Sequence, residues 1–421
     1  MSQLDIIAMS DCGASTHAAI AEYQLAKLRE TVAQARKSRF YGERLRKIPE
    51  IATLSDLAAL PFTTPADLTE PHELLCVSPA DVGRIVTLPT SGTTGKPKRV
   101  FFTADDLART LKYFQFGISP LTRPNSRVMV FFPPSAPDGL SDLLVRALAL
   151  NACDATVLGA FESACAALDA LNLSRATCAV GFPAQLLELA RTGSAPCIEY
   201  VLLCSDYISP AVVQSIEKAW NCNVFAHYGL TESGYGIGVE CEQHDGLHLR
   251  ETDLLVEIVN PESGAPLPDG EFGEVVFTTL TRRAMPLIRY RTGDRGRLLT
   301  GQCPCGSKLK RLDRHITRLS SGVEIAGGRV TMPMLDDAIF PLGRVRAFDA
   351  TMTTRGGTDN LVVRIEHNGG GSTLSQVAET LREILIIGNA IQSENLNLTV
   401  IAEPIRRIGA AKREIVDLRG K

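Results

Sequence analysis

Long hydrophobic runs, an excess of one charge and a secretion-like start are all missing from this sequence of 421 residues. No stretch of about 18 consecutive apolar residues occurs, which argues against a membrane span. The opening MSQLDIIAMSDCGASTHAAIAEYQ has no basic segment followed by an apolar one, so no secretion signal is expected. The 44 Lys and Arg nearly balance the 47 Asp and Glu, which argues against nucleic-acid binding driven by bulk charge. We therefore expect a cytoplasmic protein with neither nucleic acid nor membrane as a partner.

What the chain does have is enough length and apolar content for two or three domains with a large core, since 45% of its residues are hydrophobic. Nine of the 11 cysteines are scattered singly, mostly among apolar or alanine-rich segments. Reduced cysteine behaves there as a small core residue, which fits a reducing compartment better than a disulfide framework. Cys303 and Cys305 are the exception, two positions apart in a loop rich in glycine and proline.

The order of apolar patterns predicts an α/β fold. Residues 15–47 have helical spacing. Strand-like runs then alternate with Ala/Leu-rich helical runs through the middle of the chain, which is typical of βα units around a mostly parallel sheet. Strand–turn–strand patterns follow over about 246–313, and glycine-rich turns separate strands and a helix after Arg314. We predict a large domain over 1–313, with a β-rich subdomain at about 240–313, and a small α+β domain over 314–421.

The segment Thr90–Lys98, TSGTTGKPK, has the composition of a phosphate-binding loop between two strands. Its two glycines allow close approach of the backbone to an anion, and its hydroxyls and two lysines are donors to phosphate oxygens. The spacing differs from the P-loop, and Pro97 discourages a helix from continuing after Lys96. The alternative is an ordinary polar hairpin turn.

Three ordered motifs give the chain a family resemblance. LPTSGTTGKPKRVFFT resembles the phosphate loop of the adenylate-forming (AMP-binding) superfamily, AHYGLTE resembles its YGxTE motif, and YRTGD matches a third motif. The segments RFYGERL, LSDLAALPFTT, ECEQHDGLHL, GEVVFTTLTRRAMPLIRYRTGD and CPCGS are similar to those of the phenylacetate–CoA ligase branch. The resemblance covers nearly the whole chain, and it implies that the small C-terminal domain is mobile.

The resemblance implies a role in ATP chemistry for a set of residues. Ser91, Thr93, Thr94 and Lys96 would hold the β- and γ-phosphates, Thr231 the α-phosphate, and Glu232 a Mg²⁺ ion, which prefers hard oxygen ligands. Asp294 would accept the ribose hydroxyls and Tyr228 would stack near the adenine. Taken alone, Glu232 could instead cap a helix and Asp294 could be a turn residue. The implied catalytic residues are Lys96, Thr231, Glu232 and Lys412, and the implied nucleotide site comprises Ser91, Gly92, Thr93, Thr94, Gly95, Lys96, Tyr228, Gly229, Thr231, Asp294 and Arg314.

The acid-binding pocket is expected before and around YGLTE. Its candidates are Phe131, Phe132, Ser205, Asp206, His227 and Gly234, the last within the run SGYGI. A polar Asp206 or His227 would suit a hydroxylated or amino-bearing ring, because a site built to hydrogen-bond a group rejects analogues that lack it. His227 could equally be a packed histidine at a strand end.

Cys241, His248, Cys303 and Cys305 form a candidate structural zinc site. Three thiolates and one imidazole would close a tetrahedral coordination sphere, which leaves no open position for chemistry. Similar positions occur in some relatives of the phenylacetate–CoA ligase branch. His244 is a competing ligand, and the alternative is four unrelated residues.

The C-terminal region departs from the family pattern. Arg314 fits a family arginine, but Thr317 stands where the hinge aspartate is expected. In GAAKR, aligned on Gly409 and Arg413, Ala410 occupies the position of the family's catalytic lysine. Lys412 is two residues later and would point the same way in an extended segment. Lys412 therefore either replaces that lysine or is a surface residue.

The function that these patterns predict is ATP-dependent activation of an aromatic or heteroaromatic acid to an acyl-adenylate, with release of pyrophosphate. The acyl group would then pass to CoA or to an amine or carrier acceptor. The altered hinge and lysine favour specialised (secondary) metabolism, whereas CoA is the default acceptor. The alternative is a nucleotide-binding regulatory protein of the same fold with reduced catalysis. A homodimer is suggested by analogy.

Overall fold

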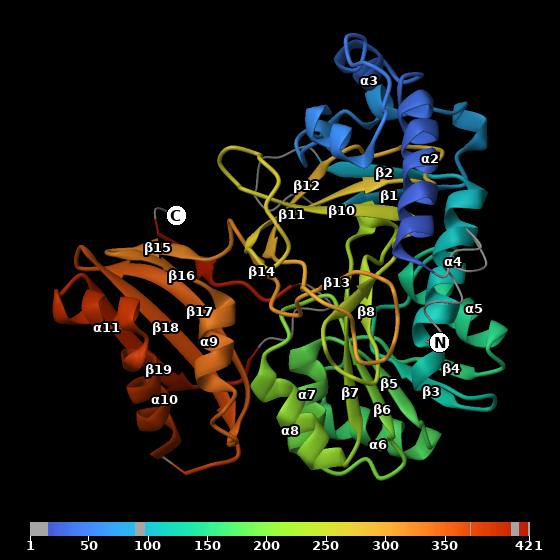
Figure 1. Ribbon diagram of the computed structural model, residues 1–421. Coiled ribbons are helices and arrows are strands. Elements are labelled where there is room, and N and C mark those ends of the chain that lie inside the picture. The colour runs from blue at the N-terminus through green and yellow to red at the C-terminus, as the bar shows by residue number, and fades with distance from the viewer. Residues whose placement is uncertain (1–15, 89–96, 371, 406–411, 420–421) are drawn as a thin grey trace. The chain divides into compact units, whose positions relative to one another are not determined.

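The structure is a computed structural model that describes residues 16–88, 97–370, 372–405 and 412–419 (Figure 1). The chain forms two compact units. Unit 1 comprises Met1–Asn125, Ser135–Asp154 and Phe225–Leu319, and unit 2 comprises Ser126–Pro134, Ala155–Val224 and Ser320–Lys421. The predicted domains divide the chain once, between residues 313 and 314, whereas each of these two units combines several separate segments. The predicted boundary therefore stays a prediction.

Unit 1 begins with helices and short 3₁₀ turns. The region predicted to be helical breaks at Ser38, whose side chain accepts a hydrogen bond from the Tyr41 N–H and so caps a second helix. The elements are α2 (His17–Ala35), α3 (Arg39–Arg44), η1 (Leu54–Ala59), η2 (Asp67–Thr69), η3 (Pro71–Leu74) and η4 (Pro79–Asp81). Tyr41 is fully buried, and its hydroxyl lies 2.5 Å from Thr63 Oγ1, which fastens this region to the core of the unit.

A hairpin flanks the predicted phosphate loop. β1 (Arg84–Leu88) and β2 (Lys98–Phe102) are antiparallel, with Leu88 opposite Lys98, so the two ends of the loop are held across from each other. A capping box of Thr103 and Asp106 then starts α4 (Ala104–Ile118), which packs against α5 (Leu140–Leu150); η5 (Ser119–Leu121) follows α4. The two predicted strands on either side of the loop are thus confirmed.

Two antiparallel arrays complete unit 1. One has the order β10-β11-β12-β14, and the other runs from the end of β7 through β8 and β9 to β13. The strands are β7 (Asn223–Tyr228), β8 (Gly238–Glu240), β9 (Leu247–Leu249), β10 (Leu254–Val259), β11 (Gly273–Thr279), β12 (Tyr290–Gly296), β13 (Arg311–Leu312) and β14 (Thr317–Arg318). The segments LLVEIV and GEVVFTT are strands as predicted, whereas GRLLTG contributes an isolated bridge between Leu298 and Leu312.

The first part of unit 2 has the predicted βα alternation. β3, β5 and β6 are parallel, and helices α6, α7 and α8 follow the strands in sequence. The bounds are β3 (Arg127–Val130), β4 (Asp154–Val157), α6 (Ala164–Ser174), β5 (Cys178–Gly181), α7 (Pro183–Thr192), β6 (Tyr200–Leu203) and α8 (Pro210–Trp220). All four residues of β5 are buried, as expected of a strand covered on both faces.

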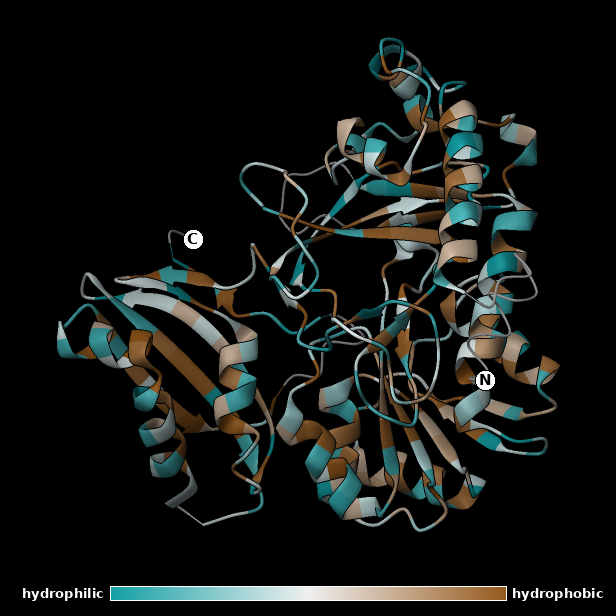
Figure 2. Ribbon diagram, in the orientation of Figure 1, coloured by the Kyte–Doolittle hydropathy of each residue, from teal (hydrophilic) through white to brown (hydrophobic). Residues whose placement is uncertain are grey.

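The C-terminal part of unit 2 is a four-stranded sheet of order β19-β18-β17-β20 with helices packed on it (Figure 1). Its elements are β15 (Val323–Ile325), β16 (Gly328–Val330), α9 (Met332–Ile339), β17 (Val345–Arg355), β18 (Thr358–His367), α10 (Ser372–Glu383), α11 (Leu385–Gln392), β19 (Leu396–Ala402) and β20 (Val416–Asp417). Gly356 and Gly357 both have positive φ in the β17–β18 turn, where glycine avoids a steric cost. Brown bands run along this sheet in Figure 2, and teal patches mark its helices.

Both the α/β class and the α+β character of the C-terminal segment are therefore confirmed. Across the described ranges, none of the helices has the length and apolar content needed to cross a bilayer.

Candidate active site

Glu232 lies in the short turn η6 (Thr231–Ser233) directly after β7. The Ser233 hydroxyl donates to the Leu230 carbonyl at 2.8 Å, and Gly234 ends the turn with a positive φ of 80°. Glu232 is 4% exposed, so its carboxylate is nearly removed from bulk water. A carboxylate in such a place needs charged or hydrogen-bonding partners.

Two partners reach Glu232 from distant parts of the sequence. Lys98 Nζ in β2 lies 3.0 Å from Glu232 Oε1, and the Tyr290 hydroxyl in β12 donates to the same oxygen at 3.0 Å. These partners stand 134 and 58 residues away along the chain. Burial, together with the neighbouring Glu232 carboxylate, raises the pKa of Tyr290 far above its ordinary value, so the phenol stays a donor.

Tyr228 and Asp294 also come together. The Tyr228 hydroxyl donates to Asp294 Oδ2 at 2.8 Å, and Arg318 Nη1 lies 3.1 Å from Asp294 Oδ1. Arg318 also donates to the Thr292 carbonyl at 2.7 Å. Burial and the Asp294 charge raise the pKa of Tyr228 well above its ordinary value. Asp294, predicted to accept ribose hydroxyls, is thus a buried acceptor flanked by two donors.

Sequence reasoning counted Lys98 among the phosphate donors of the loop but predicted no contact with Glu232, and it assigned no site role to Tyr290 or Arg318. Each nevertheless stands inside or next to a segment that carried the family resemblance: Lys98 ends TSGTTGKPK, Tyr290 begins YRTGD, and Arg318 lies four residues after Arg314. The position of each residue in or near a motif was therefore the signal that could have identified it. The missing information was which side chains meet.

Arg314 has a different partner from the one the nucleotide prediction gave it. Its Nη1 lies 3.4 Å from Glu240 Oε1, and Glu240 Oε2 accepts the N–H of Ala226 in β7 at 2.8 Å. Glu240 is completely buried, so Arg314 neutralises a charge beneath the strand that leads to Tyr228. The nucleotide-binding role of Arg314 stays a prediction.

The predicted phosphate-loop residues, namely Ser91, Gly92, Thr93, Thr94, Gly95 and Lys96, lie outside the described residues. The same holds for Ala410. Their roles stay predictions.

The pocket candidates fall in both units. In unit 1, the His227 ring centroid lies 5.9 Å from that of Tyr113, and burial lowers the pKa of His227 to about 4, so the imidazole is neutral at neutral pH. The Gly234 carbonyl accepts a hydrogen bond from Thr110 Oγ1 at 3.3 Å. At Gly236 any side chain would collide with the Tyr113 ring, which would be 1.9 Å from an added Cβ.

In unit 2, Phe131 and Phe132 are buried, and their rings pack edge-to-face on Phe161 and Phe182. Ser205 has a positive φ of 73° in the turn after β6. The acid pocket that was predicted to combine these residues with His227 and Gly234 of unit 1 stays a prediction.

Asp206 contacts the C-terminal segment within unit 2. Its Oδ2 accepts the backbone N–H of Arg413 at 3.2 Å, and its Oδ1 accepts the N–H of Tyr207 at 2.8 Å. The Arg413 guanidinium binds Asp336, donates to the Phe348 carbonyl at 3.0 Å and lies 4.3 Å over the Phe348 ring. The neighbouring Lys412 is exposed. The segment is therefore anchored at Arg413, while Lys412 keeps access to solvent.

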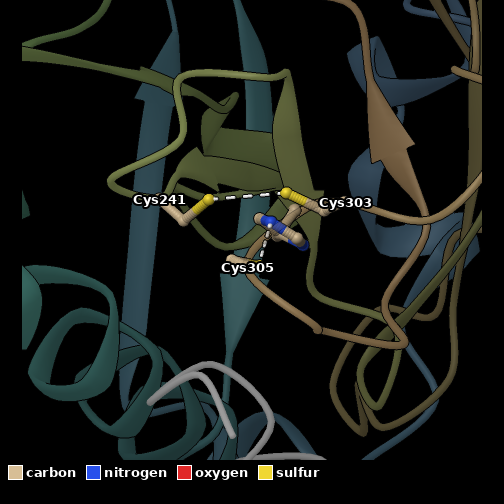
Figure 3. Close-up of side chains that lie close together, drawn as sticks. Cys241, Cys303 and Cys305 are labelled. Atoms are coloured by element: carbon tan, nitrogen blue, oxygen red, sulfur yellow. Dashed lines mark hydrogen bonds between the residues drawn. The ribbon is translucent and has the colours of Figure 1, made fainter.

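The four predicted metal ligands do converge. Cys241 follows β8, His248 lies in β9, and Cys303 and Cys305 lie on the loop before β13; Figure 3 shows the Cys241 and Cys303 sulfurs turned toward each other. Their ligand atoms all lie within 4.8 Å of one another. The competing His244 lies elsewhere, with its Nδ1 3.4 Å from Glu240 Oε2.

Two of the distances between ligand atoms in this cluster match those around a tetrahedral zinc ion. Cys241 Sγ and Cys303 Sγ are 3.7 Å apart, and Cys305 Sγ is 3.5 Å from His248 Nε2. Zinc–sulfur and zinc–nitrogen bonds of about 2.3 and 2.05 Å at tetrahedral angles place such atoms about 3.75 and 3.55 Å apart. All three cysteines are free of disulfides. The donor set and these two distances thus fit zinc.

Comparisons with known proteins identify the family of the chain. Residues 8–280, more than half of the chain, match the model of the AMP-binding enzyme family. The phenylacetate–coenzyme A ligase of Escherichia coli (strain K12) is 31% identical over 352 residues, covering 78% of each chain. The corresponding ligase of Thermus thermophilus is 29% identical over 324 residues, covering 74% of this chain and 72% of that protein.

A solved structure shows the same fold. The crystal structure of 2-hydroxyisobutyryl-CoA ligase, in the postadenylation state with 2-HIB-AMP, superposes with a TM-score of 0.81 at 19% identity. The match covers 96% of this chain and 90% of that one. The chain therefore belongs to the AMP-binding enzyme family of adenylate-forming ligases, in its phenylacetate–CoA ligase-like branch.

Proposed function

We propose that this ligase activates an aromatic carboxylic acid with ATP and then transfers the acyl group to CoA. In the first step, a carboxylate oxygen of the acid attacks the α-phosphorus of ATP. The bond from that phosphorus to the bridging oxygen breaks, and pyrophosphate leaves with the electron pair. In the second step, the CoA sulfur attacks the acyl carbon and AMP leaves.

The observation that carries the proposal is the convergence of three motif segments in unit 1. Lys98 at the end of the phosphate loop, Glu232 of YGLTE and Tyr290 of YRTGD meet at one buried oxygen. Tyr228 and Asp294, from two of these motifs, meet at 2.8 Å. Burying charged groups costs desolvation energy, so a cluster of this kind supports a functional role for these residues.

Glu232 also fits the proposed Mg²⁺ site. Both hydrogen bonds described above go to its Oε1, and Oε2 is the oxygen that a bound Mg²⁺ would take. A bound Mg²⁺ would neutralise phosphate charge, as such ions do when held by one or two carboxylates and the phosphates. Tyr290 holds the carboxylate in position, and Arg318 does the same for Asp294, so both acceptors are oriented before ATP arrives.

The proposed acid and acceptor rest on the curated relatives and on two residues of this chain. The curated relatives are phenylacetate–coenzyme A ligases, which supports an aryl acid and CoA as acceptor. His227, neutral and next to Tyr113, supports a ring that carries a hydroxyl or amino group. An amine or a carrier protein is the second acceptor to test, since Ala410 replaces the family's lysine.

The proposal includes a structural zinc ion at Cys241, His248, Cys303 and Cys305. The four ligands join β8, β9 and the loop before β13, so the ion would cross-link this part of unit 1. With four protein ligands it would have no open position for substrate.

The test is ATP–pyrophosphate exchange with a panel of aryl acids, followed by product analysis with and without CoA. We expect exchange with at least one acid and a CoA thioester when CoA is added. Glu232→Ala should reduce exchange below about a tenth of wild type, which corresponds to about 1.4 kcal/mol in the barrier. Wild-type protein that exchanges with none of a broad panel would refute the proposal and favour the regulatory alternative. If the acyl-adenylate reacts with an amine but not with CoA, the acceptor is an amine and the CoA part of the proposal is wrong.

A further inference from the structure

Lys98 and Glu232 form an ion pair at the base of the predicted phosphate loop. Nζ and Oε1 are 3.0 Å apart, with the lysine side chain 20% exposed and the glutamate side chain 5% exposed. Lys98 is the first residue of β2 and stands opposite Leu88, so it lies where the chain leaves the loop. Its ammonium therefore lies against the carboxylate at the start of the strand that follows the predicted loop.

The two partners of Glu232 Oε1 differ in charge. Tyr290 is a neutral donor held in β12, and it can keep its hydrogen bond when a cation binds the carboxylate. Lys98 carries a full positive charge at the same oxygen. A divalent cation on Glu232 would be repelled by an ammonium at contact distance, and the repulsion is strong where water is excluded.

We propose that Lys98 is a place-holder cation. In the ligand-free protein its ammonium neutralises Glu232, and a Mg²⁺ ion bound with the nucleotide would take the place of the ammonium on the carboxylate. Tyr290 stays on Oε1 in both states and keeps the carboxylate oriented. The inference rests on the proposed function, because it needs Glu232 as a metal ligand.

A place-holder has two measurable consequences in protein without nucleotide. Removing the ammonium leaves a buried carboxylate with a single neutral partner, which destabilises the fold. The same change removes the competitor of the metal, so a divalent ion alone should bind Glu232 more tightly. The gain in affinity for the ion is the effect that distinguishes the proposal, because loss of the observed ion pair by itself accounts for the lower stability.

The experiment compares Lys98→Met, Glu232→Gln and the double variant in the full-length protein without nucleotide. Lys98→Met should lower Tm by about 5 °C or more, because breaking a buried ion pair is costly. Adding Glu232→Gln should restore most of that loss. Binding of Mn²⁺ alone, followed by electron paramagnetic resonance, should be at least about tenfold tighter in Lys98→Met than in wild type. The double variant should lose this gain.

Lys27→Met is the matched control, because Lys27 pairs with Glu30 on the surface, where the side chains are 28% and 63% exposed. It should change neither measurement, as exposed pairs contribute little. If Lys98→Met does not fold, Lys98→Gln takes its place with the same expectations, since it keeps a donor but no charge. Wild-type Mn²⁺ affinity in the lysine variant would overturn the proposal, whether or not its Tm falls. Because neither measurement uses the acid or turnover, failure of the exchange assay is a separate result.

Discussion

The hydroxyl of Tyr290 should matter for adenylation although its raised pKa prevents it from acting as an acid or base near neutral pH. Tyr290→Phe removes one oxygen and keeps the ring, which is 1% exposed and packs against Phe277 with centroids 5.3 Å apart. The change therefore deletes the 3.0 Å hydrogen bond to Glu232 Oε1 while it preserves packing. Lys98 remains the described partner of that oxygen.

The size of the effect follows from the charge and the burial. A hydrogen bond to a charged acceptor contributes about 1.5–3 kcal/mol. If the carboxylate must be held in place when the transition state forms, that loss corresponds to a roughly 10- to 150-fold fall in rate. We expect kcat/KM for ATP–pyrophosphate exchange to fall within this range.

Tyr41→Phe is the control variant. Tyr41 is another buried tyrosine of unit 1, whose hydroxyl contacts Thr63 and accepts the N–H of Ile288. It should lose stability comparable to that lost by Tyr290→Phe but keep exchange near the wild-type rate. If Tyr290→Phe folds and exchanges within about twofold of wild type, the contact does not orient Glu232 and the reasoning is wrong.

Three further predictions concern other parts of the chain. Purified protein should contain about one zinc per chain, and Cys303→Ser should lose the metal and lower Tm. Cys178→Ser, which changes a buried cysteine of β5, is the control and should keep the metal. Wild-type protein that is equally stable without metal would contradict the site. If the exposed Lys412 replaces the family lysine expected at Ala410, Lys412→Ala should reduce exchange about a hundredfold, which is the usual effect of losing an electrostatic donor. An unchanged rate would show that Lys412 is a surface residue without this role. Burial lowers the pKa of His227 to about 4 in the folded protein, whereas the unfolded value is near 6.5, so the unfolded chain binds more protons between these values and stability is lost as the pH falls from 6.5 toward 4. Tm measured over this range should fall less steeply in His227→Phe than in wild type, and parallel curves would refute the shift.

The local elements and the chemistry of the motifs could be predicted from the amino-acid sequence alone. Glycine, hydroxyl and lysine content marked the segment between β1 and β2 as a candidate phosphate loop, because such residues favour a tight turn that binds an anion; the flanking strands are confirmed, and the phosphate role stays a prediction. Alternation of strand-like and helical runs predicted the parallel strands β3, β5 and β6, since periodicity reflects burial. The four metal ligands were also found from their types, because few other roles bring three cysteines and a histidine to loops and strand ends.

Which side chains meet depends on the tertiary structure. Lys98 and Tyr290 converge on Glu232, Arg318 lies beside Asp294, and Arg314 lies beside Glu240. Sequence order gives no access to these pairs, because they form between segments far apart in the chain whose packing depends on the whole core. The same holds for Asp206, predicted in the acid pocket and found bound to the Arg413 backbone. A motif therefore determines which type of side chain stands at a position in the site. The packing of distant strands determines which other side chain it meets, and that partner sets its electrostatic surroundings and its orientation.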